Sequence, residues 1–263
     1  MRFLTSGLSG REALLIDPAK AKDHAVLAEK FGFTDMLATL FGEAPKPYVA
    51  DGIGVIPVAG VIGKNLSPLE KMMGAVDVND VSAAVDAFAA NPDVQKIAFN
   101  ISSPGGTVTG VEELANKIRD LGKPTLAYTD TEMASAAYWI GSAADRVVAS
   151  PSSTVGSVGV YMAIPDMSKL YEASGVSMVV IKSSGSPLKG AGIEGTSLSA
   201  DQIANLQEGV DAIHEDFKAA VKAKRTLVAE DALRGQVFSG KQAAGKGLVT
   251  GLADSFAKAL ISF

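Results

Sequence analysis

Residues 96–122 read KIAFNISSPGGTVTGVEELANKIRDLG, and this segment contains the pattern from which the fold class is predicted. Its first part, residues 96–102, is a short apolar run that is typical of a buried strand. Two glycines follow and predict a sharp turn, after which residues 106–122 are expected to form a helix that ends at Gly122. A strand that passes into a helix through a glycine turn is the opening of a β-α-β unit.

The same alternation of strand and helix continues on both sides of this stretch. We expect strands at residues 54–62, 125–130, 146–150 and 176–182, and helices at 77–90, 133–145, 165–175 and from Ser199 to about Arg225. Short helices are expected to finish the chain. Strands separated by helices of this length predict an α/β fold with a mostly parallel sheet and covering helices.

The prolines at positions 45 and 47 mark a stiff break before this domain. We therefore predict two parts: a helical N-terminal extension over residues 1–47 and one domain over residues 48–263. Within the extension, one helix is expected to begin at Asp17-Pro18 and a second to cover residues 34–40.

Composition excludes several classes of function. Apolar residues make up 47% of the 263 residues and charged residues 20%, as in a folded globular protein. The absence of cysteine excludes a disulfide framework and a thiol nucleophile. His24 and His214 are the two histidines, both in charged helical segments, so a histidine-based triad is not expected.

Charge and hydropathy also bear on the partners. The net charge is −5 and the longest basic cluster is Lys222–Arg225, so no nucleic-acid partner is expected. No window approaches 18 apolar residues, and the first residues lack a signal-peptide pattern. We therefore expect a soluble, cytoplasmic protein without a membrane anchor.

Three stretches carry residues suited to acyl transfer. In the first, Asn100–Gly106, the glycine turn leaves backbone N–H groups free to stabilise an oxyanion, or it serves only to start a helix. In the second, residues 132–141, Ser135 lies at the expected start of a helix among small residues. Its hydroxyl is either a nucleophile near the helix dipole or a cap, or it is simply a buried small residue.

The third stretch is the Gly/Ser-rich loop at residues 182–195, which contains Lys182 and Lys189. A lysine acts as a general base only when burial or neighbouring cations lower its pKa enough to leave the amine neutral. The alternative is that these lysines are solvated surface charges. No single stretch decides between catalysis and a structural role.

Together, and in this order, the motifs resemble the signal peptide peptidase A family of serine peptidases, which has the Clp-protease/crotonase fold. The matching segments are FNISSPGGTVTGVEELANKI, MASAAYWIGSAADRVVASPSSTVGSVGV, SGSPLKGAG and GQVFSGKQAAGKGLV, and the resemblance covers about residues 50–250.

The resemblance implies a role for particular residues. Ser135 matches the nucleophile of a Ser–Lys dyad, and Lys189 matches its general base, with Lys182 as a rival in the same loop. Ser157 matches a serine that orients the lysine. The oxyanion hole is expected to be formed by the N–H of Ala136 and that of a glycine, either Gly105 or Gly106.

The resemblance also implies an endopeptidase that works through an acyl-enzyme, needs no cofactor or metal, and is more active at alkaline pH. The expected partners are a polypeptide substrate and further copies of the chain in a homo-oligomer. The opening segment Leu14–Lys20 and the single catalytic unit resemble the phage branch of the family, whose members are head maturation (capsid) proteases. These act on scaffold or capsid proteins in the host cytoplasm or the assembling procapsid.

Three alternatives remain open. These alternatives to a phage protease are a soluble bacterial peptidase of the same family, a catalytically inactive assembly factor, and an acyl-CoA enzyme of the crotonase type. The last would not need Ser135 and Lys189 in these motifs.

Overall fold

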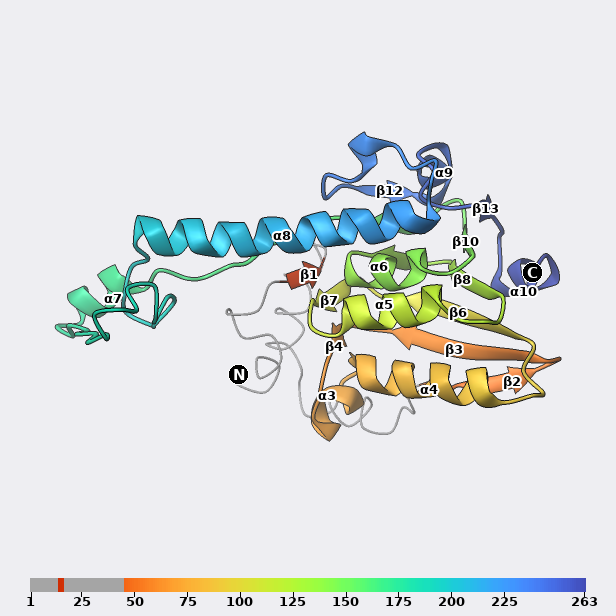
Figure 1. The fold of residues 1–263 in the computed structure, drawn as a ribbon, viewed down its shortest axis with the longest axis horizontal. Helices are drawn as coiled ribbons and strands as arrows, with labels where there is room; N and C mark the ends of the chain where they lie inside the picture. The colour runs from red at the N-terminus through yellow and green to blue at the C-terminus, as the bar shows by residue number, and fades with distance from the viewer. Residues whose placement is uncertain (1–13, 17–44) are drawn as a thin grey trace.

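The computed structural model describes residues 14–16 and 45–263 and confirms an α/β fold with a mostly parallel sheet and covering helices (Figure 1). The strands are β1 (Leu14–Ile16), β2 (Tyr48–Ala50), β3 (Ile53–Ala59), β4 (Ile62–Gly63), β5 (Val76–Asp77), β6 (Lys96–Ser102), β7 (Gly105–Thr107), β8 (Thr125–Thr129), β9 (Glu132–Ala134), β10 (Arg146–Ala149), β11 (Thr154–Gly156), β12 (Val237–Ser239) and β13 (Gly251–Leu252). The helices are α3 (Pro68–Met72), α4 (Val78–Ala90), α5 (Val111–Arg119), α6 (Ala136–Ser142), α7 (Ser168–Ala173), α8 (Ala200–Lys224), the 3-10 turn η1 (Glu230–Ala232), α9 (Gly240–Gly245) and α10 (Phe256–Ile261).

The largest sheet has six strands in the order β13-β10-β8-β6-β3-β2. All neighbouring strands are parallel except β2, which pairs antiparallel with β3. Successive side chains of β6 point to opposite faces, as strand geometry requires. Phe99 packs in the large core with α4, α5 and α6, whereas Ala98 packs in a smaller cluster with α10. The sheet is therefore covered on both faces.

Two smaller sheets lie beside the large one, in the orders β1-β7-β4-β5 and β12-β11-β9. A parallel bridge between Ser103 and Met133 links the chain just before β7 to strand β9. This bridge brings the glycine turn after β6 next to the segment that leads into α6.

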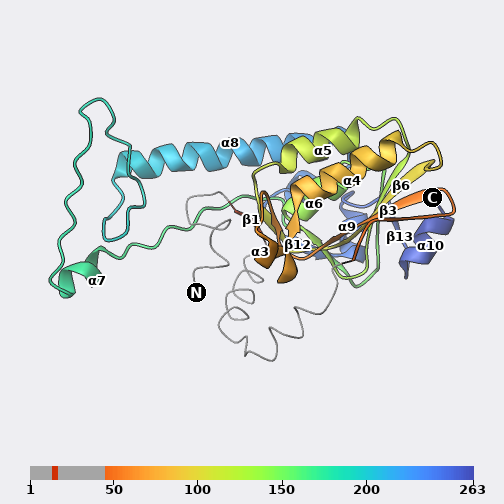
Figure 2. The same ribbon diagram turned by 90° about the horizontal axis from the view of Figure 1, so that it is seen from below.

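Helix α8 connects the body of the protein to a projecting segment, residues 165–199, which we call the arm (Figures 1 and 2). Ser199 is the N-cap of this helix, at its predicted start, and its side chain accepts from the backbone N–H of Gln202 in a capping box. Near its other end Phe217 and Val221 are buried against the body. In both views the arm lies at the far end of α8, away from the sheets.

Several predicted elements are wrong in type or extent. Residues 176–182 form no strand: Val179 is 81% and Ile181 92% exposed, because no strand of the described chain lies beside them. The helix predicted at 133–145 starts only at Ala136, since the first two residues belong to β9. Likewise, the helix predicted at 106–122 is preceded by β7 and is shorter than expected.

Within residues 1–47 the structure describes residues 14–16, which form β1, and residues 45–47, which form no helix or strand; the sequence did not predict β1. The helices expected from Asp17 and over residues 34–40 lie outside the described residues, so the helical extension stays a prediction. Among the described residues, no helix is both long and apolar enough to cross a bilayer.

Candidate active site

Ser135 occupies a strained turn between strand β9 and helix α6. Its backbone has φ 54° and ψ −123°, a conformation that costs a non-glycine residue about 1–3 kcal/mol. Two hydrogen bonds hold the turn: the Ser135 N–H donates to the Gly156 carbonyl over 2.8 Å, and the Ser135 carbonyl accepts from the Trp139 N–H over 2.9 Å. Strain that is held in this way is found at functional sites.

The hydroxyl of Ser135 is buried and has no hydrogen-bond partner among the described residues. It does not cap α6, although Ser135 stands at the N-cap position. Leaving a buried hydroxyl unpaired costs about 1–3 kcal/mol. The structure therefore excludes a capping role for this side chain and leaves its oxygen available for another interaction.

Ser157 lies next to Ser135 because their strands are paired. In the parallel pair β9–β11, Ala134 is opposite Gly156, so the two serines directly follow opposed residues. Ser157 is 4% exposed, has φ 55°, and donates its N–H to the Gln236 carbonyl over 2.7 Å. The structure thus brings these two predicted residues together at one end of the small sheet.

The glycine turn lies against the same strand. Ser103 donates its N–H to the Glu132 carbonyl over 2.8 Å and accepts from the Ala134 N–H over 3.2 Å, directly before Ser135. Gly105, at φ 102°, donates its N–H to Ser103 Oγ over 3.2 Å. Gly106 has no room for a side chain, since a Cβ would lie 1.8 Å from the Ile62 carbonyl oxygen.

Ala136 is the first residue of α6 and is fully buried. The first N–H groups of a helix have no partner within the helix. The N–H of Ala136 is such a group, and it belongs to the residue directly after Ser135. Its role in an oxyanion hole stays a prediction.

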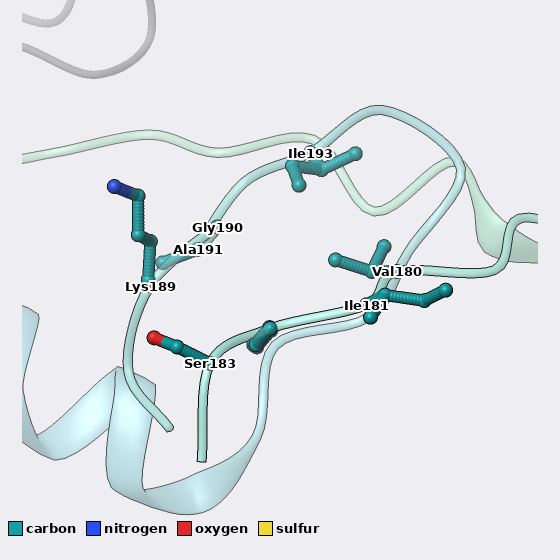
Figure 3. A pocket seen from close by; sticks show the side chains of 8 residues that line it. Val180, Ile181, Ser183, Lys189, Gly190, Ala191 and Ile193 are labelled. Carbon is teal, nitrogen blue, oxygen red and sulfur yellow. The ribbon is translucent and has the colours of Figure 1, made fainter. Parts of the chain in front are cut away.

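Lys189 is not brought to Ser135 within one chain. It is exposed on the arm, where it lines a hollow (Figure 3) together with Val180, Ile181, Lys182, Ser183, Gly190, Ala191 and Ile193. Figure 3 shows Lys189 on the opposite side of this hollow from Val180 and Ile181. The rival Lys182 donates to the Pro187 carbonyl over 3.2 Å within the arm, so it does not reach Ser135 either.

Two contacts around the site were not predicted from the sequence. His214 Nε2 lies 3.1 Å from the carbonyl oxygens of both Val158 and Leu233, and so ties α8 to the residue after Ser157. Tyr138 donates its hydroxyl to the Leu248 carbonyl over 2.7 Å, and its complete burial raises the pKa of this phenol. Neither pairing has a signal in the sequence, because each joins distant segments.

The sequence model of peptidase family S49 matches residues 117–259, which include Ser135, Ser157 and Lys189. Capsid assembly protease C of Escherichia phage lambda is 30% identical over 278 residues, covering 95% of this chain and 63% of the relative. The head-tail preconnector protein GP5 of Enterobacteria phage P21 is 29% identical over 216 residues, covering 80% and 42%. This chain is thus shorter than these relatives and spans less than two thirds of each.

Among solved structures, an enoyl-CoA hydratase from Shewanella pealeana is similar at 11% identity, with a TM-score of 0.49 over 82% of this chain and 71% of that one. We therefore describe the fold from the strand order alone.

Proposed function

Because this chain belongs to peptidase family S49, as the sequence motifs predicted, we propose that it is a serine endopeptidase in which Ser135 is the nucleophile and Lys189 the general base. The proposal rests on the surroundings and the backbone conformation of Ser135. Its hydroxyl is buried and unpartnered among the described residues, on a strained turn beside a glycine turn. A structural serine would gain no stability from this arrangement.

The general base has to come from a second copy of the chain. A base must lie within hydrogen-bond distance of its nucleophile, whereas Lys189 is exposed on the arm and does not contact Ser135 Oγ. The arm also exposes apolar side chains, including Val179 and Ile181, that no other described part of the same copy covers. Docking of the arm on a neighbouring copy would bury these side chains and carry Lys189 to Ser135 of that neighbour.

Burial in such an interface also suits the chemistry. A low-dielectric surrounding disfavours the charged form of an amine, and a general base has to be neutral. In this proposal Ser157, whose strand pairs with the strand that leads to Ser135, accepts a hydrogen bond from the incoming amine and orients it.

The proposed reaction has two stages. The neutral amine of Lys189 takes the hydroxyl proton as Ser135 Oγ attacks the carbonyl carbon of the scissile bond. Backbone N–H groups of Ala136 and of Gly105 or Gly106 hold the oxyanion. The C–N bond then breaks, the leaving amine takes the proton from the lysine, and a water molecule hydrolyses the acyl-enzyme. No metal or cofactor takes part in these steps.

The two phage relatives suggest the substrate. One is named a capsid assembly protease, and the other a head-tail preconnector protein. We propose the same setting for this chain, namely cleavage of scaffold or capsid polypeptides during assembly of the head. Its place of action would then be the host cytoplasm or the assembling procapsid.

The test is hydrolysis of unfolded casein from pH 6 to 10 by the wild type, Ser135→Ala and Lys189→Ala. Lys182→Ala is a matched control on the arm, and Ser142→Ala is a matched control on α6. We expect both dyad variants to lose activity and both controls to keep it, and the wild-type rate to rise with pH. Equal cleavage by all variants would refute the dyad. An assembled wild type that cleaves nothing would favour an inactive assembly factor.

A further inference from the structure

One edge of strand β7 is covered by a distant segment of the same chain. Strand β1 pairs antiparallel with β7, with Leu14 opposite Thr107, Leu15 opposite Gly106 and Ile16 opposite Gly105. The other edge of β7 pairs with β4. In the sheet order β1-β7-β4-β5, the edge of β7 that faces away from β4 is its outer edge. Within the described chain, this outer edge pairs with the three residues of β1.

This edge belongs to the candidate active site. β7 contains both glycines of the proposed oxyanion hole, and Ser103, just before it, is hydrogen-bonded to Glu132 and Ala134 of the strand that leads to Ser135. β7 also contacts α6, the helix that starts after Ser135. Because Ile16 is opposite Gly105, the first residue of β7, β1 ends at the end of β7 that is nearest to β9.

A strand edge without a partner presents a row of N–H and C=O groups that can pair with an extended peptide. A polypeptide that delivers a carbonyl group to Ser135 comes close to the glycine turn, because Ser103 before the turn accepts from the N–H of Ala134, directly before Ser135. Pairing with β7 would hold it there without requiring particular side chains. β1 makes this kind of backbone pairing.

We propose that residues 14–16 are an intramolecular competitor, which occupies the outer edge of β7 where an extended substrate peptide would pair. This inference rests on the proposed function. A tethered segment has a high effective concentration at its site, so a weak three-residue pairing is enough to compete with a free peptide. Displacement of β1 would therefore precede substrate binding.

Proline substitutions in β1 provide a matched pair. In an antiparallel ladder, neighbouring residues direct their N–H groups alternately toward and away from the partner strand. Of Leu14→Pro and Leu15→Pro, one therefore removes an N–H that faces β7, and the other removes an N–H that faces away. Hydrogen exchange at Gly105–Thr107 identifies the variant that breaks the pairing and does not depend on catalysis.

The decisive readout is the binding of a fluorescent peptide with the sequence of residues 11–19, REALLIDPA, measured by anisotropy on full-length Ser135→Ala protein. We expect the pairing-breaking proline variant to bind the peptide at least several-fold more tightly than the other variant and the parent. In the active protein, the same substitution should lower KM for a peptide ester without lowering kcat.

Equal peptide binding by all three proteins, or faster exchange at β7 with unchanged binding, would overturn the proposal and make β1 a purely structural strand. Cleavage near residue 16 in the wild type that is absent from Ser135→Ala would also overturn it, because the segment would then be a substrate. If the wild type hydrolyses nothing, the proposed function fails, while exchange and anisotropy still decide the role of β1.

Discussion

The indole ring of Trp139 lies flat against the ring of Phe217, with ring centroids 4.6 Å apart and an interplanar angle of 4°. Both side chains are fully buried. Trp139 is on α6 and donates its backbone N–H to the Ser135 carbonyl, whereas Phe217 is on α8, the helix that carries the arm. The stack therefore fixes the body end of α8 beside the turn at Ser135, whereas the arm lies at the other end of this helix.

Removing the aromatic ring at this contact should destabilise the fold. We expect Phe217→Ala to lower the free energy of unfolding by about 3–5 kcal/mol, because a buried ring is replaced by a cavity. Phe217→Leu, which keeps most of the apolar volume, should cost clearly less. Urea unfolding measures both values. A loss below about 1 kcal/mol for Phe217→Ala would show that α8 does not depend on this contact.

Ser157 can be tested separately from the fold. Its positive φ is unfavourable for any residue with a side chain, so Ser157→Gly should be at least as stable as the wild type. If the hydroxyl orients the lysine, kcat should nevertheless fall by about 10²-fold in both Ser157→Gly and Ser157→Ala. Steady-state kinetics together with thermal unfolding separate the two effects. Full activity in either variant would remove Ser157 from the mechanism.

Substitution by alanine should change the stability of the fold in opposite directions at Gly106 and at Gly209. Gly106→Ala would place a Cβ 1.8 Å from the Ile62 carbonyl oxygen, and should disrupt the pairing of β4 with β7 at a cost above about 4 kcal/mol. Gly209 lies inside α8 with open space around it, so Gly209→Ala should stabilise the protein by about 0.5–1 kcal/mol. Chemical denaturation measures both changes, and equal effects would contradict the packing around β7.

Asp145 should contribute stability that is lost in acid. Partial burial acts to raise its pKa, but hydrogen bonds from Lys224 and Thr125 outweigh this and hold the pKa of the carboxyl below its ordinary value. The folded state thus binds the proton less readily than the unfolded state. The contribution is present above about pH 4 and is lost as the pH falls below that value.

Asp145→Asn should therefore lower the free energy of unfolding by about 0.5–1 kcal/mol at pH 7 and by less at pH 3, because solvent screens a side chain that is 47% exposed. Unfolding curves at the two pH values measure the difference. The exposed Asp254, paired with Lys258 on the surface, is the control, and Asp254→Asn should have a small effect. A loss that does not depend on pH for Asp145→Asn would contradict this account.

Local pattern was sufficient to predict much of the core. The apolar run at 96–102 and the periodicity at 77–90 correspond to β6 and α4, and Ser199 begins α8 as its capping box indicates. The pattern failed at residues 176–182, which are apolar but exposed on the arm. An apolar run predicts burial without showing what it packs against, and the exposed run at 176–182 has the same apolar composition as a strand in the core.

The sequence also predicted part of the candidate site. The motifs identified Ser135, Ser157 and the glycine turn, which strand pairing brings together. The spacing along the chain did not show that Lys189 would lie on an arm, away from Ser135. Nor could a three-residue strand such as β1 be found from sequence, because its pairing with β7 depends on residues about ninety positions away.

The most direct test of a dyad shared between two copies is complementation. Ser135→Ala and Lys189→Ala are each expected to be inactive alone, since every site in each assembly lacks one member. When the two variants are co-expressed in equal amounts, about a quarter of the sites should combine an intact Ser135 with an intact Lys189 from the neighbouring copy. Casein hydrolysis should then return to about a quarter of the wild-type rate. Co-expression of Ser135→Ala with the double variant Ser135→Ala/Lys189→Ala is the control and should stay inactive. If the first mixture is also inactive, although the mixed assembly forms, the dyad is not shared between copies.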